Sequence, residues 1–221
     1  MAKKVHPHGK LSSSPSSSCY FTSEQETTFT IWMKSLVLNG KGCTVFDSTG
    51  HIMYRVDNYN SKHRNEVYLM DFDGRVLFTI LRKRYWRLFG FWEGYRSCSN
   101  SDSDKPAPEM KNPKNYKPGF QVRKSFRILK RSSECEVILG LDNDEPYNYT
   151  MITSCSSLGS KSACKILDNF GEIVAEVKRK EARGGGVVFG EDVLTLEVKP
   201  CVDHSLIMGL LVVYSLIYCK M

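Results

Sequence analysis

The chain has 221 residues, of which 41% are apolar and 25% are charged, and this composition is typical of a globular protein. It excludes a collagen-like chain, a fully disordered chain and a membrane protein with several spans. The formal net charge is +7, and Lys3, Lys4 and Lys10 supply three of these charges, so the rest of the chain is only mildly basic. This excess of positive charge permits an anionic lipid or nucleic acid as partner but does not require one.

The N-terminal residues 1–22 are predicted to form a disordered tail. This segment is rich in Lys and Ser and contains six serines around Pro15, so it has too little apolar surface to offset the entropy of ordering. It also lacks the apolar stretch of a signal peptide, and we therefore interpret the eight cysteines as reduced, mostly buried thiols in the cytoplasm. Residues 23–221 are predicted to form one domain with a mobile, proline-containing loop at about 97–118.

Three segments of this domain alternate between apolar and polar residues and are predicted to be strands with one buried face. They run from Phe29 to Met33, from Ile52 to Val56 and from Leu194 to Val198. Alternation with a period of two places every second side chain on the same side of a strand.

A turn motif that begins with Asp and ends with Gly recurs between apolar segments. It occurs at Asp47–Gly50, Asp71–Gly74 and Asp168–Gly171. The Asp carboxylate favours a type I turn, and the Gly accepts the positive φ that closes a hairpin. Because the motif repeats, we expect a mainly antiparallel sheet.

The last apolar segment, Leu206–Tyr218, is predicted to be a helix that is buried on every side, with Asp203 or Ser205 as its N-cap. It is shorter than the roughly 20 apolar residues of a membrane span, although a short tail anchor stays open as an alternative. A closed barrel hides such a helix and also removes the sheet edges. We therefore predict a mainly β fold, a closed antiparallel barrel of about twelve strands around a central hydrophobic C-terminal helix.

Many short motifs lie between about Phe29 and Tyr218, namely Lys34–Leu36, Val56–Tyr59, Leu69–Asp71, Trp92–Tyr95, Val122–Ser125, Ser162–Ile166, Ala175–Lys180 and Phe189–Val193. Together they resemble the plant LURP-one-related family. The resemblance implies a tubby-like fold, a twelve-stranded barrel around a hydrophobic helix, and a relation to phospholipid scramblases and to tubby-like, membrane-tethered transcription factors. It also implies a link to plant defence, but it assigns no catalytic residue and no phosphoinositide site.

The sequence offers no set of residues that points to catalysis, a metal or a cofactor. Gly159–Ser162 lacks the spacing of a phosphate-binding loop, and Asp142–Glu145 lacks a twelve-residue calcium loop. None of the five histidines has the i, i+4 spacing of a helical zinc site. We therefore expect a protein that is not an enzyme and uses no cofactor.

Two basic clusters are the remaining candidates for a binding site. Arg82–Arg87 places four cations beside two aromatic residues, and Lys178–Lys180 forms a second cluster with Arg183. Such cations can pair with lipid phosphates, while the alternative interpretation is that they are ordinary solvated strand ends. The predicted lipid-binding residues are Arg82, Arg84, Lys178 and Lys180.

These observations favour a monomeric, non-enzymatic module that binds anionic phospholipid headgroups, in particular phosphoinositides, through a basic face. It is expected in the cytoplasm, with a peripheral location at the plasma membrane or in the nucleus. Two alternatives stay open: a scaffold that binds unidentified proteins without lipid, and a scramblase-like transporter with the C-terminal segment in the bilayer. Nucleic acid is the least favoured partner, and the serine-rich segments are candidates for phosphorylation.

Overall fold

The computed structural model describes residues 21–33, 42–57, 66–85, 89–97, 117–125, 133–140, 147–153, 162–179 and 193–218. Most of the predicted tail (1–22) and of the predicted loop (97–118) lies outside these ranges. Lys180, one of the predicted lipid-binding residues, lies outside them as well, as does Asp142–Glu145.

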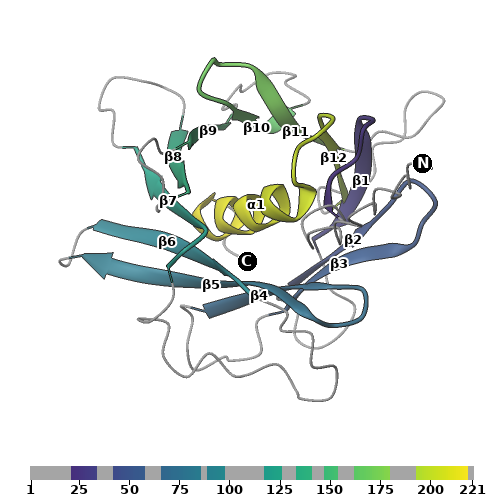
Figure 1. The fold of residues 1–221 in the computed structure, drawn as a ribbon, viewed down its shortest axis with the longest axis horizontal. Coiled ribbons are helices and arrows are strands. Elements are labelled where there is room, and N and C mark those ends of the chain that lie inside the picture. The colour runs from purple at the N-terminus through teal and green to yellow at the C-terminus, as the bar shows by residue number, and fades with distance from the viewer. Residues whose placement is uncertain are drawn as a thin grey trace, which may run out of the picture.

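Within the described ranges, twelve strands form a closed antiparallel barrel, which confirms the predicted fold class. Each strand pairs with its neighbours in the chain, and β1 closes the barrel by pairing with β12 from Thr27–Val198 to Trp32–Val193. Figure 1 shows these strands as a ring around one helix. The strands are β1 (Thr27–Trp32), β2 (Gly42–Phe46), β3 (Ile52–Asp57), β4 (Glu66–Asp71), β5 (Val76–Tyr85), β6 (Phe89–Arg96), β7 (Phe120–Lys124), β8 (Ser133–Leu139), β9 (Tyr147–Thr153), β10 (Ser162–Leu167), β11 (Ile173–Arg179) and β12 (Val193–Val198).

The three predicted turns join neighbouring strands in the way that the motif requires. In the β10–β11 turn, the Asp168 carboxylate accepts hydrogen bonds from the backbone N–H groups of Phe170 and Glu172, both at 2.9 Å. Gly171 adopts a φ of 84°, a conformation that costs glycine little and other residues more. The β2–β3 and β4–β5 turns repeat this arrangement, so a local motif sets the strand directions in three places.

The helix α1 (His204–Tyr218) fills the centre of the barrel. Asp203 is its N-cap, because its Oδ1 accepts hydrogen bonds from the backbone N–H groups of Ser205 (2.9 Å) and Leu206 (3.2 Å). All residues from Ile207 to Ser215 are buried, on every side of the helix. The structure therefore places this segment inside the barrel and not in a tail anchor.

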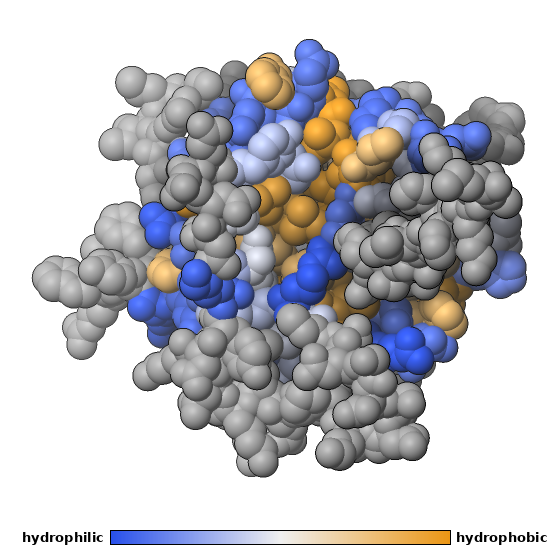
Figure 2. All heavy atoms as spheres, in the orientation of Figure 1, coloured by the Kyte–Doolittle hydropathy of each residue, from blue (hydrophilic) through white to orange (hydrophobic). Residues whose placement is uncertain are grey.

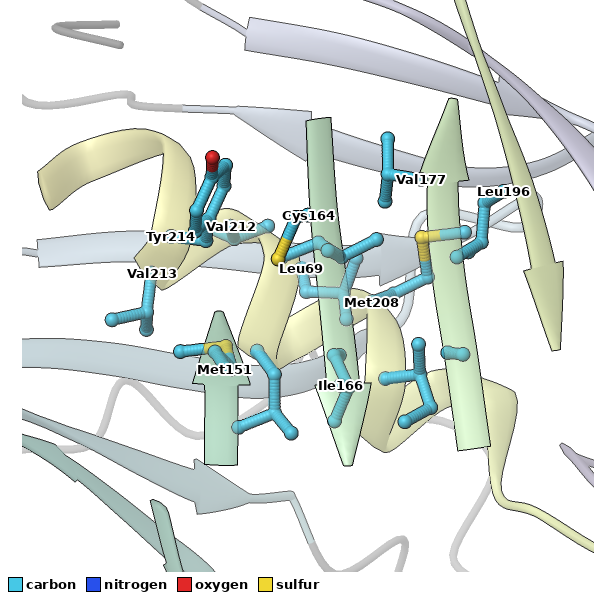
Figure 3. Packing of buried hydrophobic residues seen from close by; sticks show 14 of the residues in the cluster. Leu69, Met151, Cys164, Ile166, Val177, Leu196, Met208, Val212, Val213 and Tyr214 are labelled. Carbon is cyan, nitrogen blue, oxygen red and sulfur yellow. The ribbon is translucent and has the colours of Figure 1, made fainter. Parts of the chain in front are cut away.

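Side chains from the strand walls cover α1 along its length. Cys164 and Ile166 of β10 and Val177 of β11 point toward the helix, where Met208 and Val212 lie (Figure 3). In the orientation of Figure 1, the middle of the molecule is occupied by hydrophobic residues (Figure 2). Burial of these side chains is the main force that holds the barrel around the helix.

A buried polar pair lies where α1 begins. The hydroxyl of Tyr54 is 2.7 Å from Nδ1 of His204, and the rings of Phe21 and Phe29 pack against the imidazole. Burial lowers the pKa of His204 below its ordinary value, although the nearby Asp203 carboxylate opposes this shift. His204 is therefore neutral in the folded protein at neutral pH.

This burial predicts a pH-dependent stability. Because the folded-state pKa of His204 is lowered, its contribution is fully present above about pH 6.5, the pKa of an unperturbed histidine, and is lost as the pH falls through the lower folded-state value. The free energy of unfolding should fall by at most about 1.4 kcal/mol per pH unit from this group. Urea titrations between pH 7 and 5.5 measure the slope.

The matched variant is His204→Gln, which keeps a polar side chain at the start of α1 but does not titrate in this range. The slope should be smaller in His204→Gln than in the wild type. Equal slopes in both proteins would show that His204 does not carry the dependence, since the exposed His51 is present in each.

Candidate functional site

The two ends of the barrel differ in charge. Because neighbouring strands are antiparallel, all odd-numbered strands end at the same end of the barrel, which we call the basic rim. The opposite end, the turn rim, holds the three Asp–Gly turns and the first residue of α1. The described charged residues at the basic rim include the cations Arg55, Arg82, Lys83, Arg84, Arg123, Lys124, Lys178 and Arg179 and the carboxylates Asp57, Glu66 and Glu134, so cations are in excess there. The turn rim includes the carboxylates Asp47, Asp71, Asp73, Asp168, Glu172 and Asp203 and the cations Arg75, Arg96 and Lys199, so carboxylates are in excess at that end.

The two predicted basic clusters share the basic rim but lie on opposite sides of it. Arg82 and Arg84 are at the end of β5, and Lys178 is at the end of β11. In the strand order of the barrel, five strands separate β5 from β11 in either direction. The structure therefore brings Arg82 and Arg84 together and leaves Lys178 on the far wall.

Lys178 lies on the outer surface of β11 in a network with balanced charges. Its Nζ is 2.6 Å from Oε2 of Glu197 and 3.4 Å from Oε2 of Glu176, and Lys165 lies 3.5 Å from the same Glu176. The hydrogen bond to Glu197 is the main cause that raises the pKa of Lys178. Two lysines and two glutamates thus neutralise one another on this face.

Arg82 and Arg84 lie on the inner face of β5. Phe78 and Ile80 of the same strand are buried in the barrel core, and the pairing of β5 with β6 runs without a bulge from Phe78 to Tyr85. Alternation therefore places Arg82 and Arg84 on the inner side, at the mouth of the barrel, where both are exposed. The intervening Lys83 faces outward and lies 3.8 Å from Glu93.

Lys124 joins these two arginines from the other side of β6. On β7, Phe120 and Val122 are buried in the core, so Lys124 also takes an inner position. Arg84 pairs with Gly90, and Arg123 pairs with Phe91, so the register aligns Lys124 with Gly90.

Gly90 lies on β6 between the cations of β5 and β7. A Cβ atom added to Gly90 would lie 3.5 Å from Nε and 3.7 Å from Nη2 of Arg82, so the guanidinium already covers this residue. We call Arg82, Arg84 and Lys124, arranged around Gly90, the mouth cluster.

Aromatic rings support the mouth cluster from inside the barrel. The guanidinium carbon of Arg82 lies 5.9 Å from the centre of the Trp92 ring, and Nζ of Lys124 lies 5.2 Å from the centre of the Tyr218 ring. Tyr218 is the last residue of α1, and its hydroxyl is 3.3 Å from Sγ of Cys135 on β8. These cation–π contacts restrain the two side chains and leave their charge available.

No described carboxylate lies within 4.0 Å of a charged nitrogen of Arg82, Arg84 or Lys124. The C-terminal end of α1 carries a partial negative charge and has no basic residue of its own in the last turn, so Lys124 from the barrel wall also stabilises this end. The mouth cluster can therefore attract an anion in addition to this structural role.

Two further properties describe the rest of the molecule. Within the described residues, no cluster of three or more His, Cys, Asp or Glu side chains is positioned to hold a metal ion. Over the same ranges, no helix has both the length and the apolar character needed to cross a bilayer.

Sequence reasoning missed Lys124 and its position opposite Arg84. The signal was present in the alternation, because Phe120, Val122 and Lys124 follow the same period-two pattern as Phe78 and Ile80 with Arg82. What the sequence could not provide was the pairing of β5, β6 and β7 in this register.

Comparisons with known proteins agree on one family. The family model described as LURP-one-related matches residues 27–215. Protein LURP-one-related 11 of Arabidopsis thaliana is 48% identical over 98% of this chain and 89% of its own length, and Protein LURP-one-related 3 of the same plant is 45% identical over 91% and 84%. An X-ray structure of an Arabidopsis thaliana protein has a TM-score of 0.56 at 17% identity and covers 88% of this chain and 92% of that chain, which supports the fold alone.

Proposed function

The chain belongs to the LURP-one-related family, and from this premise we propose that it is a non-enzymatic protein that docks on anionic phospholipid membranes with the basic rim of its barrel. The mouth cluster carries the proposal, because three exposed cations share one inner surface and have no described carboxylate partner. The predicted relation to phospholipid scramblases, the role in plant defence and the peripheral membrane location belong to the same proposal.

The charge of the whole rim adds to this local cluster. Arg123 and Arg179 end strands at the same rim and add to attraction at long range, whereas the charge of Lys178 is balanced by Glu176 and Glu197. Each Lys or Arg near an anionic membrane surface is worth about 1 kcal/mol, which corresponds to about fivefold in binding. The turn rim, with its carboxylates, would face away from the membrane.

Co-sedimentation with vesicles tests the proposal. The protein should bind vesicles that contain phosphatidylserine and not vesicles of phosphatidylcholine alone, and binding should weaken as salt shortens the Debye length from about 10 Å at 0.1 M. The variant Arg82→Ala/Arg84→Ala/Lys178→Ala/Lys180→Ala should lose binding by at least tenfold, with Lys178 contributing least because two glutamates hold it.

The control Arg75→Ala/Lys199→Ala removes two cations from the turn rim and should bind as the wild type does, whereas Arg82→Ala/Arg84→Ala, which removes the same number of cations from the mouth cluster, should bind more weakly. Equal loss in the control would contradict docking through the basic rim. Absent or salt-independent binding of the wild type would overturn the lipid proposal and favour the scaffold alternative.

The scramblase-like alternative placed the C-terminal segment in the bilayer. In the structure, α1 lies inside the barrel with Ile207, Leu210 and Val213 fully covered. No observation here favours that alternative over docking through the rim.

A further inference from the structure

We propose that one side of the turn rim binds a basic, arginine-containing segment of a partner protein. This surface lies at the end of the barrel opposite the basic rim, so the inference goes beyond membrane docking and does not depend on it. It consists of aromatic and acidic residues from the start of β9 and from the β10–β11 turn. We call it the aromatic patch, and its members are Tyr147, Tyr149, Asp168, Phe170 and Glu172.

Exposed apolar side chains are concentrated at the turn rim. Of the large hydrophobic residues that the structure describes as exposed, Trp32 lies at the basic rim, and the others lie at the turn rim: Ile52, Phe72, Tyr147 and Phe170. Phe170 is the most exposed of them and stands at the tip of the β10–β11 turn. Aromatic residues are enriched at protein interfaces because they supply a large contact area, so this end of the barrel is the better candidate for a protein partner.

Two contacts join the aromatic residues of the patch. The rings of Tyr147 and Tyr149 meet edge to face with their centres 5.2 Å apart, so the buried Tyr149 supports the exposed Tyr147. The backbone N–H of Asn148 donates a hydrogen bond of 3.0 Å to Oδ1 of Asn169, the residue before Phe170. The start of β9 is therefore fastened to the tip of the β10–β11 turn, and Tyr147 and Phe170 share one stretch of the rim, where β9, β10 and β11 lie side by side (Figure 1).

The carboxylates of the patch have no described cation to neutralise them. Asp168 accepts hydrogen bonds from backbone N–H groups of its own turn, and Glu172 is exposed. Among the described residues, no Lys, Arg or His nitrogen lies within 4.0 Å of either carboxylate. In the β4–β5 turn, by contrast, the carboxylate of Asp73 lies 4.0 Å from the guanidinium of Arg75. The patch thus combines exposed aromatic rings with negative charge that a cationic partner can balance.

A guanidinium group matches both features of this surface. It stacks on aromatic faces and also donates two parallel hydrogen bonds to a carboxylate. An ammonium group is a compact and strongly hydrated point charge, so it gains less from the rings. An anionic group would be repelled by Asp168 and Glu172. The patch therefore favours an arginine side chain, and a protein in the aqueous phase can reach it while the basic rim faces a membrane.

Fluorescence anisotropy with labelled synthetic peptides tests the inference. The probes are a peptide of repeated Gly-Arg-Ser units and two peptides in which Lys or Glu replaces Arg. The wild type should bind the Arg peptide most tightly, the Lys peptide more weakly and the Glu peptide not at all. Phe170→Ser and Glu172→Gln should each weaken binding of the Arg peptide about two- to fivefold, the loss expected for one cation–π contact or one exposed ion pair. The double variant should lose about tenfold.

The matched control is Phe72→Ser/Asp73→Asn, which removes one exposed phenylalanine and one carboxylate from the β4–β5 turn. Four strands separate this turn from the β10–β11 turn in either direction, so the control changes the opposite wall of the same rim. It should bind the Arg peptide as the wild type does. Equal losses in the control and in Phe170→Ser/Glu172→Gln would show only diffuse attraction to the rim and would overturn the site.

The remaining outcomes are equally decisive. Absence of binding by the wild type would overturn the inference, and equal binding of the Lys and Arg peptides would overturn the choice of arginine. Because both changed side chains are exposed, Phe170→Ser/Glu172→Gln should unfold at the temperature of the wild type. The same variant should also bind phosphatidylserine vesicles as the wild type does, so failure of the peptide site and failure of membrane docking give different results.

Discussion

Gly94→Ala is expected to lower the free energy of unfolding by about 3 kcal/mol or more. A Cβ atom at this position would lie closer than 3.0 Å to three ring carbons of Phe120, on the neighbouring strand β7. Phe120 is completely buried, so its ring has no free direction in which to move. Overpacking of a tight core costs about 1–3 kcal/mol, and this contact is at the severe end.

The helix makes the position of this ring still more restricted. Gly209 of α1 faces the same ring, since a Cβ atom there would lie 3.1 Å from Cε1 of Phe120. Phe78 packs against Phe120 with ring centres 5.5 Å apart. The Phe120 ring is thus held between a strand glycine and a helix glycine, where α1 approaches the wall.

Thermal unfolding measures the effect, and for a domain of this size a loss of 3 kcal/mol lowers Tm by roughly 6–12 °C. The control is Gly90→Ala on the same strand, whose added Cβ would meet nothing closer than 3.5 Å and should change stability little. Phe120→Leu, which shortens the obstructing side chain, should recover part of the loss in the double variant. Equal stability of Gly94→Ala and the wild type would contradict this packing.

Much of the fold could be predicted because its determinants are local. Asp168 and Gly171 form their turn through hydrogen bonds within five residues, and Asp203 caps α1 through the next three residues. In the Leu206–Tyr218 segment only Gly209 and Ser215 are not apolar, so the segment has few places to be hidden other than the centre of a barrel.

The site could be predicted only in part because it depends on contacts that are distant in the sequence. Arg82 and Lys178 are both basic and both end a strand, yet the closure of β1 onto β12 places them on opposite walls. The ion pair between Lys178 and Glu197 joins β11 to β12, and the two residues are 19 positions apart in the sequence. The sequence alone does not predict how these two strands pair. The Tyr54–His204 contact links residues 150 positions apart and had no local signal.

The second large effect concerns the orientation of the protein on a membrane. If the basic rim docks on lipid, the start of β12 at this rim should be close to the headgroups, and the tip of the β10–β11 turn should be at the far end of the barrel. Val193 and Phe170 mark these two places, and Phe170 is 86% exposed. Nitroxide labels at Val193→Cys and Phe170→Cys report their distance from the membrane surface.

The labels require a background in which the reactive cysteines are replaced by serine. Cys43, Cys135 and Cys164 are buried and can stay, whereas Cys201 is exposed. Burial raises the pKa of the Cys43 thiol to about 12, which suppresses its reaction with a labelling reagent. The residues to replace are Cys201 and those outside the described ranges, Cys19, Cys98, Cys155 and Cys219.

Spin relaxation by a nickel chelate fixed to lipid headgroups then tests docking through the basic rim most directly. On addition of anionic vesicles, the spin-relaxation rate of the label at position 193 should increase strongly. The relaxation rate of the label at position 170 should stay at its value in solution. Equal relaxation at the two positions, or faster relaxation at position 170, would contradict docking through the basic rim.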